Sequence, residues 1–212
     1  MTLFGTAFRM GVEPFFFSHS KSENPQKTYA QITNYFVILG SLILLVVIVF
    51  VDVLAKLLLG NATYFQALNI VPIVLLASFC LGVYHNLSVW YKITDRTKYG
   101  AYISTFGALL TIVINLVFIP MIGYLASAIA TLVAYGSMMS LSFYFGRKHY
   151  PVPYNLRKAV FYGGLSILFS VLSFYIFDRN LIVGCLLLFV FLGLIYKLEG
   201  DKLKTIFINR AD

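Results

Sequence analysis

Long stretches without charged residues divide this chain, and short segments between them hold nearly all of its lysines and arginines. A helix needs about 20 mostly apolar residues to cross a bilayer, and the uncharged stretches provide six such helices. The sequence therefore predicts an all-α fold, a polytopic transmembrane helix bundle. The predicted spans lie near residues 32–52, 67–90, 100–119, 124–145, 159–177 and 180–197. A turn at residues 120–123 separates the third span from the fourth.

The basic residues alternate between loops as membrane topology requires. Thirteen of the 16 Lys and Arg residues fall in loops on one side of the predicted spans, and the opposite loops hold only Lys56 and Arg179. Because cytoplasmic loops carry an excess of Lys and Arg, we expect the basic loops and the C-terminus in the cytoplasm. Asp52 and Lys56, spaced i,i+4, are expected to form an ion pair at the outer end of the first span.

The composition excludes an ordinary soluble domain. The chain is 60% hydrophobic and 11% charged, whereas soluble domains are about 25% charged. The net charge of +8 is carried largely by short loops beside apolar spans. That placement favours contact with anionic lipid headgroups. We therefore expect membrane lipids as partners, and no nucleic acid.

Motifs of catalysis and metal binding are missing from the sequence. It has no P-loop, no HExxH, no GxSxG and no paired carboxylates on one predicted helix. Cys80 and Cys185 both fall within predicted spans, with no CxxC and no His/Cys cluster, and are expected to be apolar fillers. The sequence therefore predicts a protein that is not an enzyme, with no metal and no cofactor.

The first 18 residues are apolar apart from Arg9 and Glu13. As a helix they would reach roughly 27 Å, just short of a full span, and Pro14 is expected to kink or end that helix. Arg9 would lie near the membrane midplane, one turn from Glu13 on the same face. Ionisable groups at that depth usually face a partner or a water-filled cavity. Arg9 is thus either a cavity cation that meets an anionic substrate or half of an internal pair with Glu13.

Three uncharged polar side chains within the spans are further cavity candidates. His85 and Asn86 are adjacent in the second span, and Asn115 lies in the third. His85 and Asn115 have the alternative role of structural hydrogen-bond partners between helices. The fourth span carries small residues at spacings of three and four, which predicts a helix buried within the bundle. These residues are Gly123, Ser127, Ala130, Ala134 and Ser137.

Four landmarks follow one another in the middle of the chain: GVYHNLS at 82–88, WYK at 90–92, TKYG at 97–100, and Asn115 followed by Ile119-Pro120 and Gly123. With them the chain resembles the C-terminal half of bacterial polysaccharide-biosynthesis flippases. These are exporters of lipid-linked oligosaccharides in the MOP (multidrug/oligosaccharidyl-lipid/polysaccharide) superfamily. The N-terminal FRMGVEPFFFS at 8–18 is similar to the end of that family's eighth helix.

The resemblance implies a 14-helix transporter with two six-helix lobes and two further helices, of which this chain is the C-terminal part. Residues 1–20 would end an incomplete transmembrane helix. Residues 21–150 would be the four-helix part of the C-terminal lobe, and 151–212 two additional helices with a cytoplasmic tail. The N-terminal lobe would be missing and would act as a partner.

The function implied by the resemblance is the flipping of an O-antigen-type, polyprenyl-pyrophosphate-linked oligosaccharide across the bacterial cytoplasmic (inner) membrane by alternating access. Arg9 would lie in the cationic cavity. Two alternatives stay open. A drug or cation antiporter of the same superfamily needs an acidic intramembrane site, for which Glu13 is the candidate. The other alternative is a non-transporting membrane assembly protein.

Overall fold

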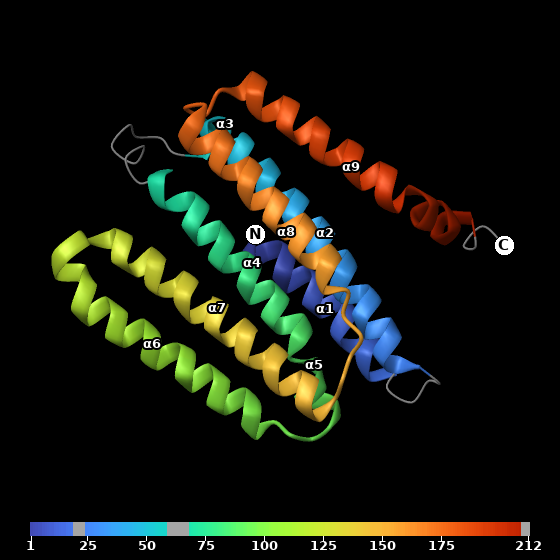
Figure 1. Ribbon diagram of the computed structural model, residues 1–212. Coiled ribbons are helices and arrows are strands. Elements are labelled where there is room, and N and C mark those ends of the chain that lie inside the picture. The colour runs from blue at the N-terminus through green and yellow to red at the C-terminus, as the bar shows by residue number, and fades with distance from the viewer. Residues whose placement is uncertain (19–23, 59–67, 209–212) are drawn as a thin grey trace.

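The computed structural model describes residues 1–18, 24–58 and 68–208, and this part of the chain is helical, without strands (Figure 1). Six of the helical segments described are long and apolar enough to cross a membrane, which confirms the predicted polytopic bundle. The elements are α1 (Thr2–Ser18), α2 (Pro25–Val49), α3 (Val51–Leu58), α4 (Val71–Leu87), α5 (Val89–Ile93), α6 (Lys98–Ile122), α7 (Tyr124–His149), α8 (Leu156–Val171), the π-helical turn η2 (Leu172–Ile176) and α9 (Leu181–Ile208).

The spans run back and forth between the two ends of one bundle (Figure 1). The second span, residues 68–93, combines α4 with α5, and the fifth, residues 156–176, combines α8 with η2. The last helix continues to Ile208, well beyond its predicted end at residue 197. Among the basic residues expected at the cytoplasmic side, Lys21 and Arg210 lie outside the described residues.

Helix α1 is shorter than the spans, because its 17 residues reach only about 25 Å. It starts midway along the bundle and runs to the end at which α2 begins (Figure 1). Pro14 lies inside it, so the helix does not end there. Val12 and Phe16, on either side of the proline, both pack in a cluster with the buried Tyr29. These contacts offset the one backbone hydrogen bond that a proline removes.

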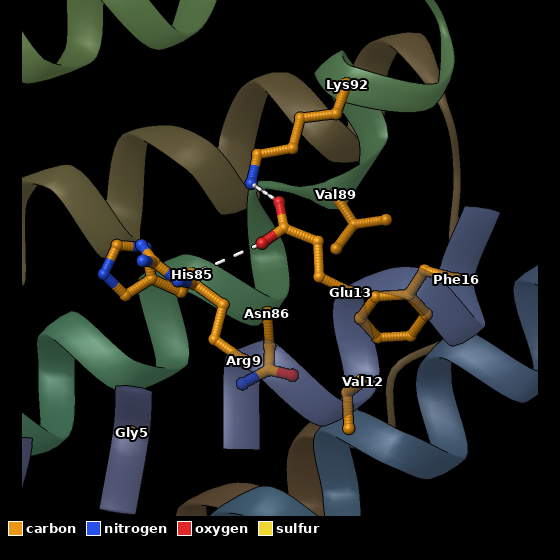
Figure 2. A pocket seen from close by; sticks show the side chains of 9 residues that line it. All are labelled: Gly5, Arg9, Val12, Glu13, Phe16, His85, Asn86, Val89 and Lys92. Carbon is orange, nitrogen blue, oxygen red and sulfur yellow. Dashed lines mark hydrogen bonds and ion pairs between the residues drawn. The ribbon is translucent and has the colours of Figure 1, made fainter. Parts of the chain in front are cut away.

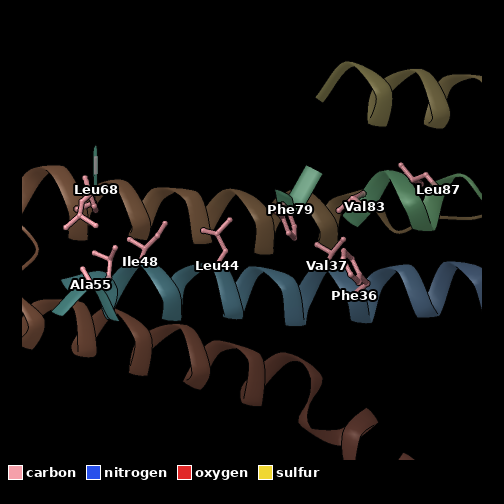
Figure 3. Close-up of a cluster of buried hydrophobic side chains, with 11 residues drawn as sticks. Phe36, Val37, Leu44, Ile48, Ala55, Leu68, Phe79, Val83 and Leu87 are labelled. Atoms are coloured by element: carbon pink, nitrogen blue, oxygen red, sulfur yellow. The ribbon is translucent and has the colours of Figure 1, made fainter. Parts of the chain in front are cut away.

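The largest apolar cluster is centred on α2 and α4 (Figure 3). Phe36 of α2 packs there against Phe79 and Val83 of α4. Gly82 permits this close approach, because a Cβ atom at that position would lie 2.4 Å from Cζ of Phe36. A second cluster joins the opposite side of α2 to α8 and α9. The bundle therefore has α2 at its centre, with α4 on one side and α8 on the other.

The third and fourth spans form a hairpin that turns at Gly123 alone. Helix α6 continues through Pro120 to Ile122, so the turn predicted over residues 120–123 is too long. Gly123 has a φ of +62° and a ψ of −141°, a combination that glycine adopts without strain. The chain thus reverses its direction at one residue.

Helix α7 packs between α4 and α6, and the burial that its small residues predicted holds along one part of its surface and not all round the helix. The buried stripe itself follows a spacing of four rather than the predicted alternation of three and four. Ala130 and Ala134 belong to both stripes, whereas Gly123 lies in the turn and Ser127 and Ser137 are only partly buried. The stripe observed is Ala126, Ala130, Ala134, Met138, Ser142 and Gly146.

Asp52 pairs with Arg179 and not with Lys56. Nη1 of Arg179 donates a hydrogen bond to Oδ1 of Asp52 over 3.0 Å, and the guanidinium lies 5.5 Å from the ring centroid of Phe174. The i,i+4 spacing allows the predicted pair with Lys56. However, the turn after η2 brings the planar guanidinium directly to the carboxylate. This contact ties the start of α3 to the turn that precedes α9.

Candidate functional site

Four of the five predicted cavity residues line one pocket between α1 and the α4–α5 segment (Figure 2). Helix α1 contributes Arg9 and Glu13, and α4 contributes His85 and Asn86. The structure therefore joins two groups of residues that are far apart in the sequence. The rest of the lining is Gly5, Val12, Phe16, Val89 and Lys92.

Helical spacing explains why these residues share the pocket. Arg9, Glu13 and Phe16 recur after four and three residues and therefore lie on one face of α1. His85, Val89 and Lys92 show the same spacings from α4 into α5. The two elements approach closely at two glycines. A Cβ atom added to Gly5 would lie 3.9 Å from Cα of Gly82. Nδ2 of Asn86 donates to the carbonyl oxygen of Gly82 over 3.0 Å, which fixes that side chain along α4.

Two cations contact the carboxylate of Glu13 in this pocket, Arg9 from the same helix and Lys92 from α5. The ammonium of Lys92 donates a hydrogen bond to Oε1 of Glu13. The other carboxylate oxygen, Oε2, lies 4.0 Å from Nε of Arg9, beyond hydrogen-bond distance. Lys92 is thus the closer partner of Glu13, and the internal Arg9–Glu13 contact is an ion pair without a hydrogen bond.

The sequence does not predict Lys92 as a site residue, because the positive-inside rule already accounts for a lysine in that loop. One signal was available. Lys92 follows His85 by seven residues, so the two share a face if the helix continues past Ser88. The structure contains that continuation as α5. Arg9 is therefore not the only cation of the pocket.

The three charged side chains are neither fully buried nor fully in solvent. Their exposed fractions are 42% for Arg9, 32% for Glu13 and 29% for Lys92. Two cations and one carboxylate leave the cluster with a net charge of +1. The enclosed part of the pocket measures about 10 Å³, which is room for about one water molecule. A ligand larger than a water molecule would therefore reach Arg9 only from the exposed side of its side chain.

Asn115 does not belong to this pocket. It lies on α6, which packs mainly on α7. Its Oδ1 atom is buried and accepts no hydrogen bond from the described residues, so the structure does not show the predicted interhelical hydrogen bond at this oxygen.

The described residues contain no group of three or more His, Cys, Asp and Glu side chains that could hold a metal ion. Cys80 and Cys185 are free thiols, each partly buried on its own helix. The chemistry that this pocket offers is therefore that of hydrogen-bonded charges, with a guanidinium, an ammonium, a carboxylate, an imidazole and a carboxamide in one place.

The sequence model of the MatE family matches residues 4–117, just over half of the chain. The matched region contains every residue that lines the pocket. No curated protein and no solved structure matches the chain.

Proposed function

Because the chain belongs to the MatE family, whose members are transporters of the MOP superfamily, we propose that it serves the export of a polyprenyl-pyrophosphate-linked oligosaccharide. The observation that carries this proposal is the hydrogen bonding of the Arg9 guanidinium. Its guanidinium donates no hydrogen bond to any other described residue, although a carboxylate lies one helical turn away. A guanidinium in that state is available to an anion.

The chemistry of the proposed substrate fits this group. A pyrophosphate and a hydrophilic glycan cannot cross a hydrocarbon layer of about 30 Å without help. Arginine binds phosphate oxygens with two parallel hydrogen bonds. Such bonds are stronger where water is scarce, as in the interior of a membrane bundle. Arg9 thus supplies one of the charges that would stabilise the phosphates on their way across.

The same cluster argues against transport of a cation. Glu13 is the one acidic side chain that lines the pocket, and Lys92 already neutralises it. A cationic drug or ion would have to displace that ammonium and would still meet Arg9. The net charge of +1 therefore favours an anionic substrate over the antiporter alternative.

The chain is a multi-pass membrane protein. We propose the bacterial cytoplasmic membrane as its location, with the basic loops and the C-terminus in the cytoplasm. Alternating access needs two lobes that move against each other. Export should therefore require a first lobe besides the helices seen here, as the resemblance implies.

The proposal is tested by export in cells that lack their own flippase and express this chain together with a first lobe of the superfamily. Arg9→Ala should abolish surface glycan while the amount of protein in the membrane stays nearly constant. Arg9→Lys should retain partial export, because a charge remains but the two-pronged geometry is lost.

Arg147→Ala is the matched control, because Arg147 is an exposed cation in the last turn of α7, outside the pocket. It should export normally. Normal export by Arg9→Ala would refute the assignment of the anion site to Arg9.

A further inference from the structure

We propose that Lys92 is a positioning residue that holds the carboxylate of Glu13 and so leaves the guanidinium of Arg9 available to a phosphate-bearing substrate. The inference rests on the function proposed above and adds a residue that controls its anion site. Lys92 and Arg9 compete for the carboxylate of Glu13 (Figure 2).

Without Lys92, Glu13 would be the natural partner of Arg9. The two residues are spaced i,i+4 on α1, which places their side chains side by side. Arginine and carboxylate groups commonly form two parallel hydrogen bonds. In this structure they do not, since the closest approach is 4.0 Å from Nε to Oε2. The carboxylate is drawn instead to the ammonium of Lys92, which reaches it from another element.

The position of Lys92 is fixed by its neighbours on α5. Trp90 is 2% exposed, and its Nε1 atom donates to the carbonyl oxygen of Ser142 on α7 over 3.2 Å. The hydroxyl of Tyr91 lies 3.1 Å from the hydroxyl of Tyr84 on α4. Because α5 is anchored on both sides, Lys92 is presented to α1 from a rigid support and can hold Glu13 in one place.

The net charge of the cluster shows how the contact between Lys92 and Glu13 affects Arg9. With Lys92 in place, the cluster has a net charge of +1, and Arg9 makes only a 4.0 Å ion pair with Glu13 and no hydrogen bond to it. Loss of the ammonium would leave Glu13 to bind Arg9, and the resulting pair would be neutral. An incoming phosphate would then have to break a charge-assisted hydrogen bond before it could bind. Removing the charge of Glu13 as well would free Arg9 again.

A second role for Lys92 would be direct contact with the phosphate. The two roles differ in the double variant Lys92→Met with Glu13→Gln. A positioning residue becomes dispensable once the carboxylate is gone, so binding returns. A residue that touches the phosphate stays necessary, so binding remains weak.

The test is binding of farnesyl pyrophosphate, a short prenyl pyrophosphate, to the full 212-residue chain in lipid nanodiscs. We expect Arg9→Gln to weaken binding about tenfold or more, the usual effect of losing a hydrogen bond to a charged group. Lys92→Met should weaken binding to a similar degree, because the phosphate would first have to break the new bond between Arg9 and Glu13. The double variant Lys92→Met with Glu13→Gln should return to within about threefold of the unmodified chain. Lys98→Met is the control, because that lysine is exposed at the start of α6 and should not affect binding.

The outcomes separate the inference from the proposed function. Weak binding by the double variant, together with weak binding by Arg9→Gln, would overturn the positioning role and leave the anion site intact. Unchanged binding by Arg9→Gln would overturn the anion site itself. If Lys92→Met does not fold, Lys92→Gln replaces it with the same expected loss and the same rescue. Lys92→Arg keeps the charge and should bind nearly normally, and tenfold weaker binding by that variant would also count against the inference.

Discussion

Single residues set how closely the helices of this bundle approach, and Gly82 is the tightest case. A Cβ atom added to it would lie 2.4 Å from Cζ of Phe36. Phe36 is 1% exposed. Its ring centroid lies 5.4 Å from that of Phe4 and 4.8 Å from that of Phe8. The ring is held on several sides, so it cannot move away at low cost.

We therefore expect Gly82→Ala to lower the free energy of unfolding by about 1–3 kcal/mol, the usual effect of overpacking a core. Thermal unfolding in detergent would measure the change. Gly164→Ala is the control, because a Cβ atom at Gly164 would meet nothing within 4 Å. That change should be neutral or stabilise by up to about 1 kcal/mol, as alanine favours helix over glycine. Equal stability of the two variants would contradict the packing argument.

At the scale of elements, polar contacts of side chains connect one helix to the next. Oγ of Ser166 on α8 donates to the carbonyl oxygen of Ser41 on α2 over 2.7 Å. Trp90 fastens α5 to α7 through the carbonyl oxygen of Ser142. The Asp52–Arg179 pair does the same for α3 and the turn before α9. These contacts select one arrangement among helices whose apolar surfaces could pack in several ways.

The Asp52–Arg179 pair gives the prediction at this scale. A double-mutant cycle with Asp52→Ala and Arg179→Ala should yield a coupling free energy of up to about 1 kcal/mol, since both side chains are partly exposed. The matched cycle with Lys56→Ala should give a coupling near zero. Unfolding in detergent at low salt is the appropriate measurement, because salt screens such pairs. A larger coupling for Lys56 than for Arg179 would restore the pairing predicted from sequence.

At the scale of the whole molecule, the two ends of the bundle differ in the charge of their loops. The loops that follow α5 and α7 lie at one end, and the turns that follow α6 and η2 lie at the other (Figure 1). The first end carries the basic segments near Arg96 and Lys148, and the second carries Gly123 and Asp178. From the positive-inside rule, we expect the first end to face the cytoplasm.

Reporter fusions after Arg96 and Lys148 should accordingly report a cytoplasmic location, and fusions after Gly123 and Asp178 a location outside. The reason is that successive ends of apolar spans must lie on opposite sides of the bilayer. A further fusion after Ala62, which lies outside the described residues, should also report outside. If two consecutive loops reported the same side, the six-span topology would be wrong.

The sequence by itself determined the class of fold, the number and order of the spans and the position of Arg9 within α1. These properties depend on local quantities. Hydrophobicity adds up along a segment of about 20 residues, and the charge of each loop acts through its own residues. Helical spacing also placed Arg9 and Glu13 on one face of α1. None of these inferences required knowledge of which helices are neighbours.

Only the tertiary structure decided the partners of the charged groups. Glu13 and Lys92 are 79 residues apart, and Asp52 and Arg179 are 127 apart. In both cases the sequence contains a nearer partner at i,i+4 spacing. Asp52 pairs with the distant Arg179 instead, and Glu13 keeps a 4.0 Å ion pair with Arg9 but makes its hydrogen bond to the distant Lys92. An ion pair forms where packing brings two groups together with good geometry, and packing follows from the whole bundle. Packing of the bundle likewise places His85 and Asn86 in one pocket with the charged residues of α1, whereas Asn115 lies outside that pocket.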